Sequence, residues 1–380
     1  MSSYRVWADV DLDALGHNLA VIRRRAGAGV RVMLVVKADA YGHGAVAISH
    51  HAVRRGVSSL GVGTSAEALE LRAAGVRVPI LILGTILEDE TAATLRHSIE
   101  IGLHTMDRLQ ALQAKARAMG LVARVHLNVD TGMGRLGVLP HRAPELLAAI
   151  ASASHLELVG VMTHITAPDG ALADSTREQM IRFQEVLTAT RARGLSTGLV
   201  HVANSASLFT GLRPLHDAVR PGIAAYGVLP TELPGAGELR PVLSLKSQVV
   251  FLKDLSPGAP LGYGSTFRAE RATRIATLPL GYNDGVSVRL SNRGEVLIRG
   301  RRAPIVGSVT MDYTTVDVTD IPGAGVGDTA TLIGRDGAER IGAGEVARAA
   351  GTIGYEILVG IGGRVPRIAG DGPPKADPYV

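Results

Sequence analysis

Short apolar runs alternate with amphipathic stretches over the first 230 residues of the chain. Eight runs stand at residues 30–36, 59–63, 79–83, 99–103, 124–129, 158–163, 199–203 and 218–222. The stretches between them have helical spacing, as in residues 65–75, where we expect Ser65 as the N-cap and Gly75 as the C-cap. Eight strand–helix units in this length predict a (β/α)8 TIM barrel. A doubly wound sheet is the structural alternative, disfavoured because the count closes at eight.

The pattern changes after a segment rich in Pro and Gly, residues 229–241, which is typical of a domain linker. Short runs bounded by Gly, Pro or Asp follow at residues 242–252, 274–279, 294–298, 314–318 and 329–333. They predict a β domain of meanders or a small barrel, with a short helix at residues 344–350 and a disordered tail from residue 370. We therefore expect an α/β barrel over residues 11–235 and a mainly-β domain over residues 236–380.

Composition excludes several classes of protein. The chain has 380 residues, 46% hydrophobic and 20% charged, which is enough for two domains. The net charge of +5 is modest and Arg is scattered, so no nucleic-acid surface is expected. The absence of Cys excludes disulfides and thiolate chemistry, and we predict no metal site. The N-terminus lacks a signal-peptide pattern and no apolar run approaches the ~20 residues of a membrane span, so we expect a cytoplasmic protein without a membrane partner.

Polar residues follow the predicted strands in turn. Active-site groups of TIM barrels lie at the carboxyl ends of the strands, and phosphate is often bound after the seventh and eighth. The residues in question are Lys37, residues 130–135 including Arg135, His164, Asn204, Ser205, Arg220 and Gly222. A purely structural distribution would scatter such residues over both ends of the barrel.

Lys37 ends a β-branched apolar run and is followed by a turn-prone segment with Tyr41 and His43. Burial lowers the pKa of a lysine amine from about 10.4, and a neutral amine can attack a carbonyl. The residue is therefore a candidate Schiff-base lysine. A single strand-final lysine more commonly extends to solvent, and the polar residues that follow the other strands favour the catalytic interpretation.

Two further segments indicate anion binding. Residues 132–137 match the dinucleotide pattern G-x-G-x-x-G, but residues 138–140 interrupt the helix that the pattern requires, so we interpret the loop as a holder that directs Arg135 at an anion. Arg220 precedes Pro221 and Gly222, and a glycine allows a phosphate to approach free backbone N–H groups. With Asn204 and Ser205 this segment forms a candidate phosphate cup. His164 taken alone is more often a structural residue.

Tyrosines recur beside glycines or acids in the predicted β domain. They are Tyr263, Tyr282, Tyr313 and Tyr355, in a chain with only 3% aromatic residues. Each one alone is typical of packing, but together they indicate a polar pocket.

Six collinear motifs resemble the alanine racemases, pyridoxal-phosphate enzymes of fold type III. The motifs occupy residues 37–44, 130–137, 220–223, 262–267, 311–312 and 364–367 and cover almost the whole chain. The resemblance implies a (β/α)8 barrel followed by a C-terminal β domain that the N-terminal strand, residues 1–10, joins. It also implies a head-to-tail homodimer whose active sites take residues from both subunits.

The resemblance implies a role for each matching position. Lys37 would carry pyridoxal 5'-phosphate as an internal aldimine, and Tyr263 would be the second catalytic base. Cofactor contacts would come from Tyr41, Ser205, Gly222, Ile223 and Tyr355 at the phosphate, beside Asn204, and from Arg220 at the pyridine nitrogen with His164 behind it. Substrate contacts would come from Arg135, Met311 and Tyr282. Tyr263, Tyr282 and Met311 would belong to the partner subunit.

The expected reaction is interconversion of L- and D-alanine, which would supply D-alanine for peptidoglycan. Two bases must flank the cofactor, because one proton leaves from one face and another returns on the opposite face. A tyrosine, with a free pKa of about 10, needs neighbouring cations to act as such a base. The sequence departs from the family pattern at Asn128, where many members have a carbamylated lysine, and at Asn283, Arg289, Ser308 and Tyr313. These departures concern substrate preference and rate.

Three alternatives stay open. A racemase of serine or of broad specificity would use the same scaffold. An amino-acid decarboxylase of this architecture would have a cysteine-containing motif in the β domain, and the chain has no Cys. A non-catalytic pyridoxal-phosphate carrier of the single-barrel type would leave the second domain and its tyrosines without a role.

Overall fold

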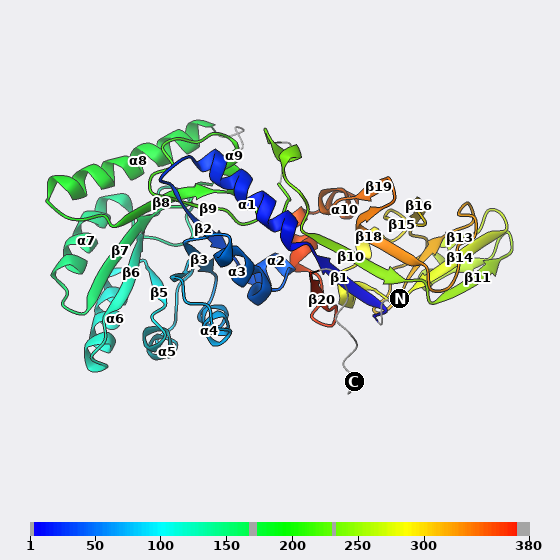
Figure 1. The fold of residues 1–380 in the computed structure, drawn as a ribbon, viewed down its shortest axis with the longest axis horizontal. Helices are drawn as coiled ribbons and strands as arrows, with labels where there is room; N and C mark the ends of the chain where they lie inside the picture. The colour runs from blue at the N-terminus through cyan, green and yellow to red at the C-terminus, as the bar shows by residue number, and fades with distance from the viewer. Residues whose placement is uncertain (1–3, 167–172, 230–232, 371–380) are drawn as a thin grey trace.

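Eight parallel strands close into a barrel in the N-terminal part of the chain (Figure 1). The computed structural model describes residues 4–166, 173–229 and 233–370. The barrel strands are β2 (Arg31–Val35), β3 (Ser59–Val62), β4 (Ile80–Ile82), β5 (Glu100–Leu103), β6 (Ala123–Asn128), β7 (Leu156–Met162), β8 (Leu199–Asn204) and β9 (Ala218–Arg220). Each strand pairs with the next, and β9 pairs with β2. The eight apolar runs form these strands, so the predicted barrel is confirmed.

Helices cover the outside of the barrel (Figure 1). They are α1 (Leu12–Ala26), α3 (Ala45–Arg54), α4 (Ser65–Ala73), α5 (Thr91–Arg96), α6 (Met106–Ala118), α7 (Ala143–Ser152), α8 (Ala173–Ala192) and the short α9 (Ser205–Phe209). The prediction that Ser65 caps α4 was wrong by one residue. Thr64 is the N-cap and forms a reciprocal capping box with Glu67, whereas Gly75 follows the C-cap Ala74 with a φ of 87°.

The C-terminal part is mainly β, as predicted. Its strands are β10 (Leu243–Gln248), β11 (Phe251–Leu255), β12 (Pro260–Leu261), β13 (Phe267–Arg268), β14 (Thr273–Leu278), β15 (Glu295–Ile298), β16 (Arg301–Pro304), β17 (Thr314–Asp317), β18 (Thr329–Asp336), β19 (Glu339–Ile341) and β20 (Arg367–Ala369), with helices α10 (Ala343–Ala350) and α11 (Gly354–Val359). The run at residues 242–252, expected as one strand, is two. β10 pairs with β1 (Val6–Val10) and β18 in the large sheet, whereas β11 pairs with β14 in a three-stranded sheet.

The first strand of the chain lies in the β domain although the barrel follows it in sequence. β1 (Val6–Val10) pairs antiparallel with β10 and parallel with β20. Asp11 then caps α1 by accepting a 2.8 Å hydrogen bond from the Ala14 N–H. Residues 230–232 of the linker lie outside the described part. Near the end of the linker, the Asn18 side chain of α1 donates to the Arg240 carbonyl and accepts from the Arg240 N–H. The predicted disordered tail beyond Gly370 also lies outside it.

The interior of the barrel holds both apolar and polar side chains. Met33, Leu81 and Met162 come from the non-adjacent strands β2, β4 and β7 and form a cluster separate from the main core. Side chains of non-adjacent strands meet inside a barrel. The register pairs Leu81 with Glu100 and Met162 with His201, and paired residues point to the same face. Glu100 and His201 therefore also point into the barrel.

A left-handed turn follows the first barrel strand. In α2 (Lys37–Gly42), the φ angles of the four residues from Ala38 to Tyr41 lie between 52° and 54°. This conformation costs non-glycine residues roughly 1–2 kcal/mol each, so surrounding contacts must stabilise it. The Ala40 N–H donates to the Val36 carbonyl at 2.8 Å, and the Asp39 carboxylate accepts from the Ala45 N–H at 2.6 Å. These bonds close the turn on itself and join it to α3.

Both domains hold the left-handed turn in place. From the barrel, Glu67 of α4 accepts from the Ala38 N–H at 2.7 Å. From the β domain, Arg367 donates to the Gly42 carbonyl at 3.0 Å. A Cβ added to Gly42 would lie 2.2 Å from the Leu358 carbonyl oxygen of α11, so the two backbones touch at this point. The conformation of the turn thus depends on docking of the β domain.

Two glycine substitutions test this dependence. Gly42→Ala should reduce the free energy of unfolding by roughly 2–4 kcal/mol, because the methyl group adds a backbone clash to an unfavourable positive φ. Gly44→Ala is the matched control: its φ is 91°, but the nearest atom to its Cβ is a side-chain carbon of Arg367 at 3.8 Å. That variant should lose only about 1 kcal/mol in urea unfolding. Equal losses of unfolding free energy in the two variants would contradict the close contact between Gly42 and α11.

Candidate functional site

A cavity of about 410 Å³ lies at the carboxyl ends of the barrel strands. The structure brings to its wall ten of the residues expected from the sequence, namely Lys37, Tyr41, Arg135, His164, Asn204, Ser205, Arg220, Gly222, Ile223 and Tyr355. The first nine come from the barrel and its loops, and Tyr355 comes from α11 of the β domain. The cavity therefore lies where the two domains meet.

Lys37 lines this cavity. It is the first residue of the left-handed turn and is exposed to solvent. Partial burial lowers the pKa of its amine, the positive charge of Arg135 lowers it further, and Glu67 opposes both effects. Glu67 is engaged with backbone, accepting from the N–H groups of Ala38 and Gly63, each at 2.7 Å. A lowered pKa increases the fraction of neutral, nucleophilic amine.

Arg135 lies on a loop whose backbone is held by hydrogen bonds from nearby side chains. The Asp130 carboxylate accepts from the N–H groups of Gly132 and Gly134, each at 3.0 Å. The Asn128 amide donates to the Leu136 carbonyl at 3.1 Å. No helix opens at these glycines, since the next helical segment begins at residue 140. The loop therefore lacks the geometry of a dinucleotide site.

Arg220 is buried at the floor of the cavity, with 5% of its surface exposed. Its Nη1 donates to the His201 carbonyl at 2.7 Å and to His201 Nδ1 at 3.0 Å, and its Nη2 donates to the Thr163 carbonyl at 2.8 Å. Burial lowers the pKa of Arg220 to about 10, so the group stays protonated at neutral pH. His164 Nδ1 lies 3.4 Å from Nη2 of Arg220. Burial lowers the pKa of His164 to about 3, and the nearby positive charges of Arg220, Arg135 and Lys37 contribute to this shift.

The residues of the predicted phosphate cup lie together on the cavity wall. The Ser205 hydroxyl oxygen accepts from the N–H groups of Gly222 at 2.9 Å and Ala224 at 3.2 Å. A Cβ on Gly222 would lie 2.3 Å from the Tyr41 hydroxyl, so only glycine fits there. Asn204 has a structural role as well, because its side chain caps α9 by accepting from the Ser207 N–H at 2.9 Å.

Two tyrosines complete the cup. The rings of Tyr41 and Tyr355 lie 6.0 Å apart. Burial, with a smaller contribution from Tyr355, raises the pKa of Tyr41, and burial raises the pKa of Tyr355 to about 12. Both hydroxyls therefore stay protonated and can donate to an anion.

Tyr263, Tyr282 and Met311 do not reach the cavity of their own chain. Tyr263 and Tyr282 begin short 3-10 helices (Tyr263–Ser265 and Tyr282–Asp284) of the β domain, and Met311 lies on a loop; their exposed fractions are 78%, 46% and 53% in the order Tyr263, Tyr282 and Met311. Ser308 supports the first of these segments, because its hydroxyl donates to the Tyr263 carbonyl at 3.0 Å. Large, exposed side chains on ordered loops are a feature of interaction surfaces.

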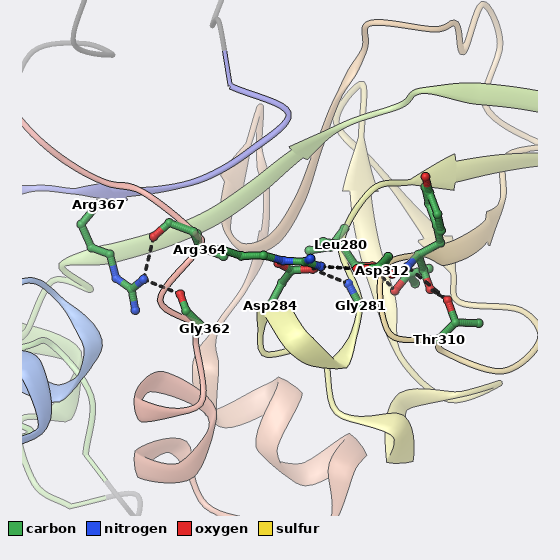
Figure 2. A network of polar contacts seen from close by, with 11 residues as sticks. Leu280, Gly281, Asp284, Thr310, Asp312, Gly362, Arg364 and Arg367 are labelled. Atoms are coloured by element: carbon green, nitrogen blue, oxygen red, sulfur yellow. Dashed lines mark hydrogen bonds and ion pairs between the residues drawn. The ribbon is translucent and has the colours of Figure 1, made fainter. Parts of the chain in front are cut away.

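Arg364 joins the segments that carry Asp284 and Asp312 through two ion pairs (Figure 2). Tyr282 and Met311 lie in these two segments. Buried Asp284 pairs with Nε and Nη2 of Arg364 at 2.5 and 2.9 Å, and Nη2 also contacts Asp312 at 2.7 Å. Asp284 further accepts from the Gly281 N–H at 2.8 Å. A bidentate arginine–carboxylate pair restricts both partners, so the two segments keep one relative arrangement.

Sequence reasoning missed several residues that organise the site. Glu67 stands three residues after Thr64, the spacing of a capping box, and this signal could have identified it. Glu100, His126 and His201 lie within or beside apolar runs, and a polar residue in a buried strand is itself a signal. Among the described residues, no group of His, Asp and Glu is arranged to hold a metal ion, and no helix is long and apolar enough to cross a membrane.

Similarity to known proteins agrees with this arrangement. Residues 10–230 match the family model of the alanine racemase N-terminal domain, and residues 242–369 match that of the C-terminal domain. The alanine racemase of Syntrophobacter fumaroxidans is 43% identical over 94% of this chain and 95% of its own, and that of Symbiobacterium thermophilum is 43% identical over 96% and 97%. The crystal structure of the alanine racemase from D-cycloserine-producing Streptomyces lavendulae superposes with a TM-score of 0.91, at 35% identity over 98% of both chains. The chain therefore belongs to the alanine racemase family of isomerases.

Proposed function

We propose that this protein interconverts L- and D-alanine with pyridoxal 5'-phosphate and so supplies D-alanine for peptidoglycan. The observation that supports this most is the joint position of the Lys37 amine, the Arg220 guanidinium and the donors around Gly222 on one cavity wall. A cofactor with an aldehyde, a ring nitrogen and a phosphate can use one of these groups for each: the amine for the aldehyde, the guanidinium for the nitrogen and the donors for the phosphate. The donor set therefore fits this cofactor.

The chain's own residues would share its binding. The Ile223 N–H, the Ser205 hydroxyl, and the hydroxyls of Tyr41 and Tyr355 would hold the phosphate. Gly222, whose N–H donates to Ser205, would leave room for the phosphate to approach. When bound, pyridoxal phosphate supplies a carbonyl that condenses with amines and a ring that stabilises the charge left by loss of an α-proton.

Arg220 would face the ring nitrogen. A guanidinium does not give up its proton near neutral pH and would leave the nitrogen unprotonated. An acidic partner would instead donate a proton and favour side reactions such as transamination. His164, kept neutral by its surroundings, adds no competing charge behind Arg220.

Two bases on opposite faces would move the α-proton. Lys37 would act on one face of the bound amino acid, and Tyr263 of a second copy of the chain would act on the other. Arg135, with the partner's Met311 and the partner's Tyr282, would hold the substrate carboxylate and close the entrance. The exposure of Tyr263, Tyr282 and Met311 in the single chain supports a homodimer whose subunits complete each other's sites.

Exchange of the α-proton in heavy water tests the reaction and its substrate. We expect L-alanine to exchange fastest in a panel of L-amino acids followed by proton NMR, together with decay of optical rotation to zero. Faster exchange of L-serine would favour the serine or broad-specificity racemase. Release of carbon dioxide would indicate a decarboxylase, and no exchange with any amino acid would support the non-catalytic carrier.

Subunit mixing tests the shared site. Lys37→Ala and Tyr263→Phe should each lower kcat by at least about a hundredfold. A purified heterodimer of these two variants should recover about half of the parental activity, because it contains one intact Lys37–Tyr263 pair of its two.

The reciprocal heterodimer is the control. It joins a parental subunit to one that carries both substitutions, so each of its shared sites lacks one base and it should be inactive. Activity in this control and none in the first heterodimer would show that both bases act within one subunit.

A further inference from the structure

Four polar side chains cross the barrel interior beneath the cavity. Glu100 of β5, His126 of β6, His201 of β8 and Arg220 of β9 are 3%, 0%, 0% and 5% exposed. Barrel interiors are usually filled by branched apolar residues, and buried charges are unfavourable unless they are paired. Only Arg220 has a role in the proposed reaction, so the other three need a separate explanation.

These side chains form one continuous series of hydrogen bonds. Glu100 Oε2 lies 3.0 Å from His126 Nε2, His126 Nδ1 lies 2.9 Å from His201 Nε2, and His201 Nδ1 lies 3.0 Å from Arg220 Nη1. Gly160 of the intervening strand β7 provides the space for the histidine pair. A Cβ at that position would lie 2.6 Å from His126 Nδ1.

The two ends of the series dictate its direction. Arg220 can only donate, so His201 must accept at Nδ1 and carry its proton on Nε2. His126 then accepts at Nδ1 and also carries its proton on Nε2, which it donates to the Glu100 carboxylate. Burial lowers the pKa of His201 well below its usual range, and Arg220 and His126 lower it further, which agrees with a neutral ring.

We propose that Glu100 is a positioning residue for Arg220, acting through His126 and His201. Its carboxylate accepts the last hydrogen bond of the series and so fixes both imidazoles in the Nε2–H form. Arg220 thereby keeps one orientation at the cavity floor. The effect on turnover rests on the proposed racemase function, whereas the histidine protonation pattern does not.

A surface role for Glu100 is the competing explanation. Its other oxygen, Oε1, lies 3.1 Å from Nη2 of Arg124, whose side chain is 39% exposed. The geometry at Oε1 does not meet that of a hydrogen bond. Arg124 is partly open to solvent, which weakens its attraction, so it gives weak reason for a carboxylate inside the barrel.

Histidine NMR on the full-length parental protein is the first test. With 15N-labelled histidine, the signals of His126 and His201, assigned by single substitutions, should show protonated Nε2 and unprotonated Nδ1. A proton on Nδ1 of either ring, or a doubly protonated ring, would overturn the proposal. This measurement does not need a loaded cofactor.

Three variants separate the two explanations. Glu100→Gln keeps an acceptor for His126 and should preserve the Nε2–H pattern and most of the turnover. Glu100→Leu removes it and should disturb the pattern and lower kcat for alanine by at least about tenfold with little change in KM. Arg124→Gln, the matched control, should leave both readouts at parental values.

Each outcome has one meaning. A parental pattern and kcat in Glu100→Leu, or equal losses in Arg124→Gln, would overturn the proposal. If Glu100→Leu does not fold, the parental spectrum decides. Absence of racemisation in the parental protein would contradict the proposed function and leave the protonation test unaffected.

Discussion

The left-handed turn from Lys37 to Gly42 is the constraint on which the site depends. Four consecutive non-glycine residues with positive φ are unfavourable, and the turn persists because both domains bind it. Glu67 holds its start from the barrel side, and Arg367 and the α11 backbone hold its end from the β domain. The position of the Lys37 amine is therefore a property of the docked domains, and neither domain alone would fix it.

The barrel and the β domain contribute different parts of the chemistry. The barrel supplies positive charge and donors around one cavity, with Arg220 held by backbone carbonyls and by the buried series that ends at Glu100. The β domain supplies Tyr355 to the same cavity and presents an exposed Tyr263. The barrel thus supplies most of the cavity lining, and the second domain completes the lining and, in the proposed dimer, supplies the second base.

The sequence predicted the barrel well because its strands are buried on both faces and read as continuous apolar runs. Seven of the ten cavity residues could be predicted because groups at strand ends share one edge of the barrel, whereas Tyr41, Ile223 and Tyr355 were expected from the family resemblance. The left-handed turn could not be predicted, because Ala38 to Tyr41 have no propensity for positive φ and their conformation comes from tertiary contacts. Glu100 and His126 were missed for a related reason: their partners lie on other strands.

The most direct test of the central claim is chemical trapping at Lys37. The protein is incubated with pyridoxal 5'-phosphate, reduced with borohydride, digested and examined by mass spectrometry, which locates the amine that formed a Schiff base. The account predicts one modified peptide, containing Lys37, at stoichiometric yield. Modification spread over exposed lysines such as Lys253, with Lys37 unmodified, would contradict it.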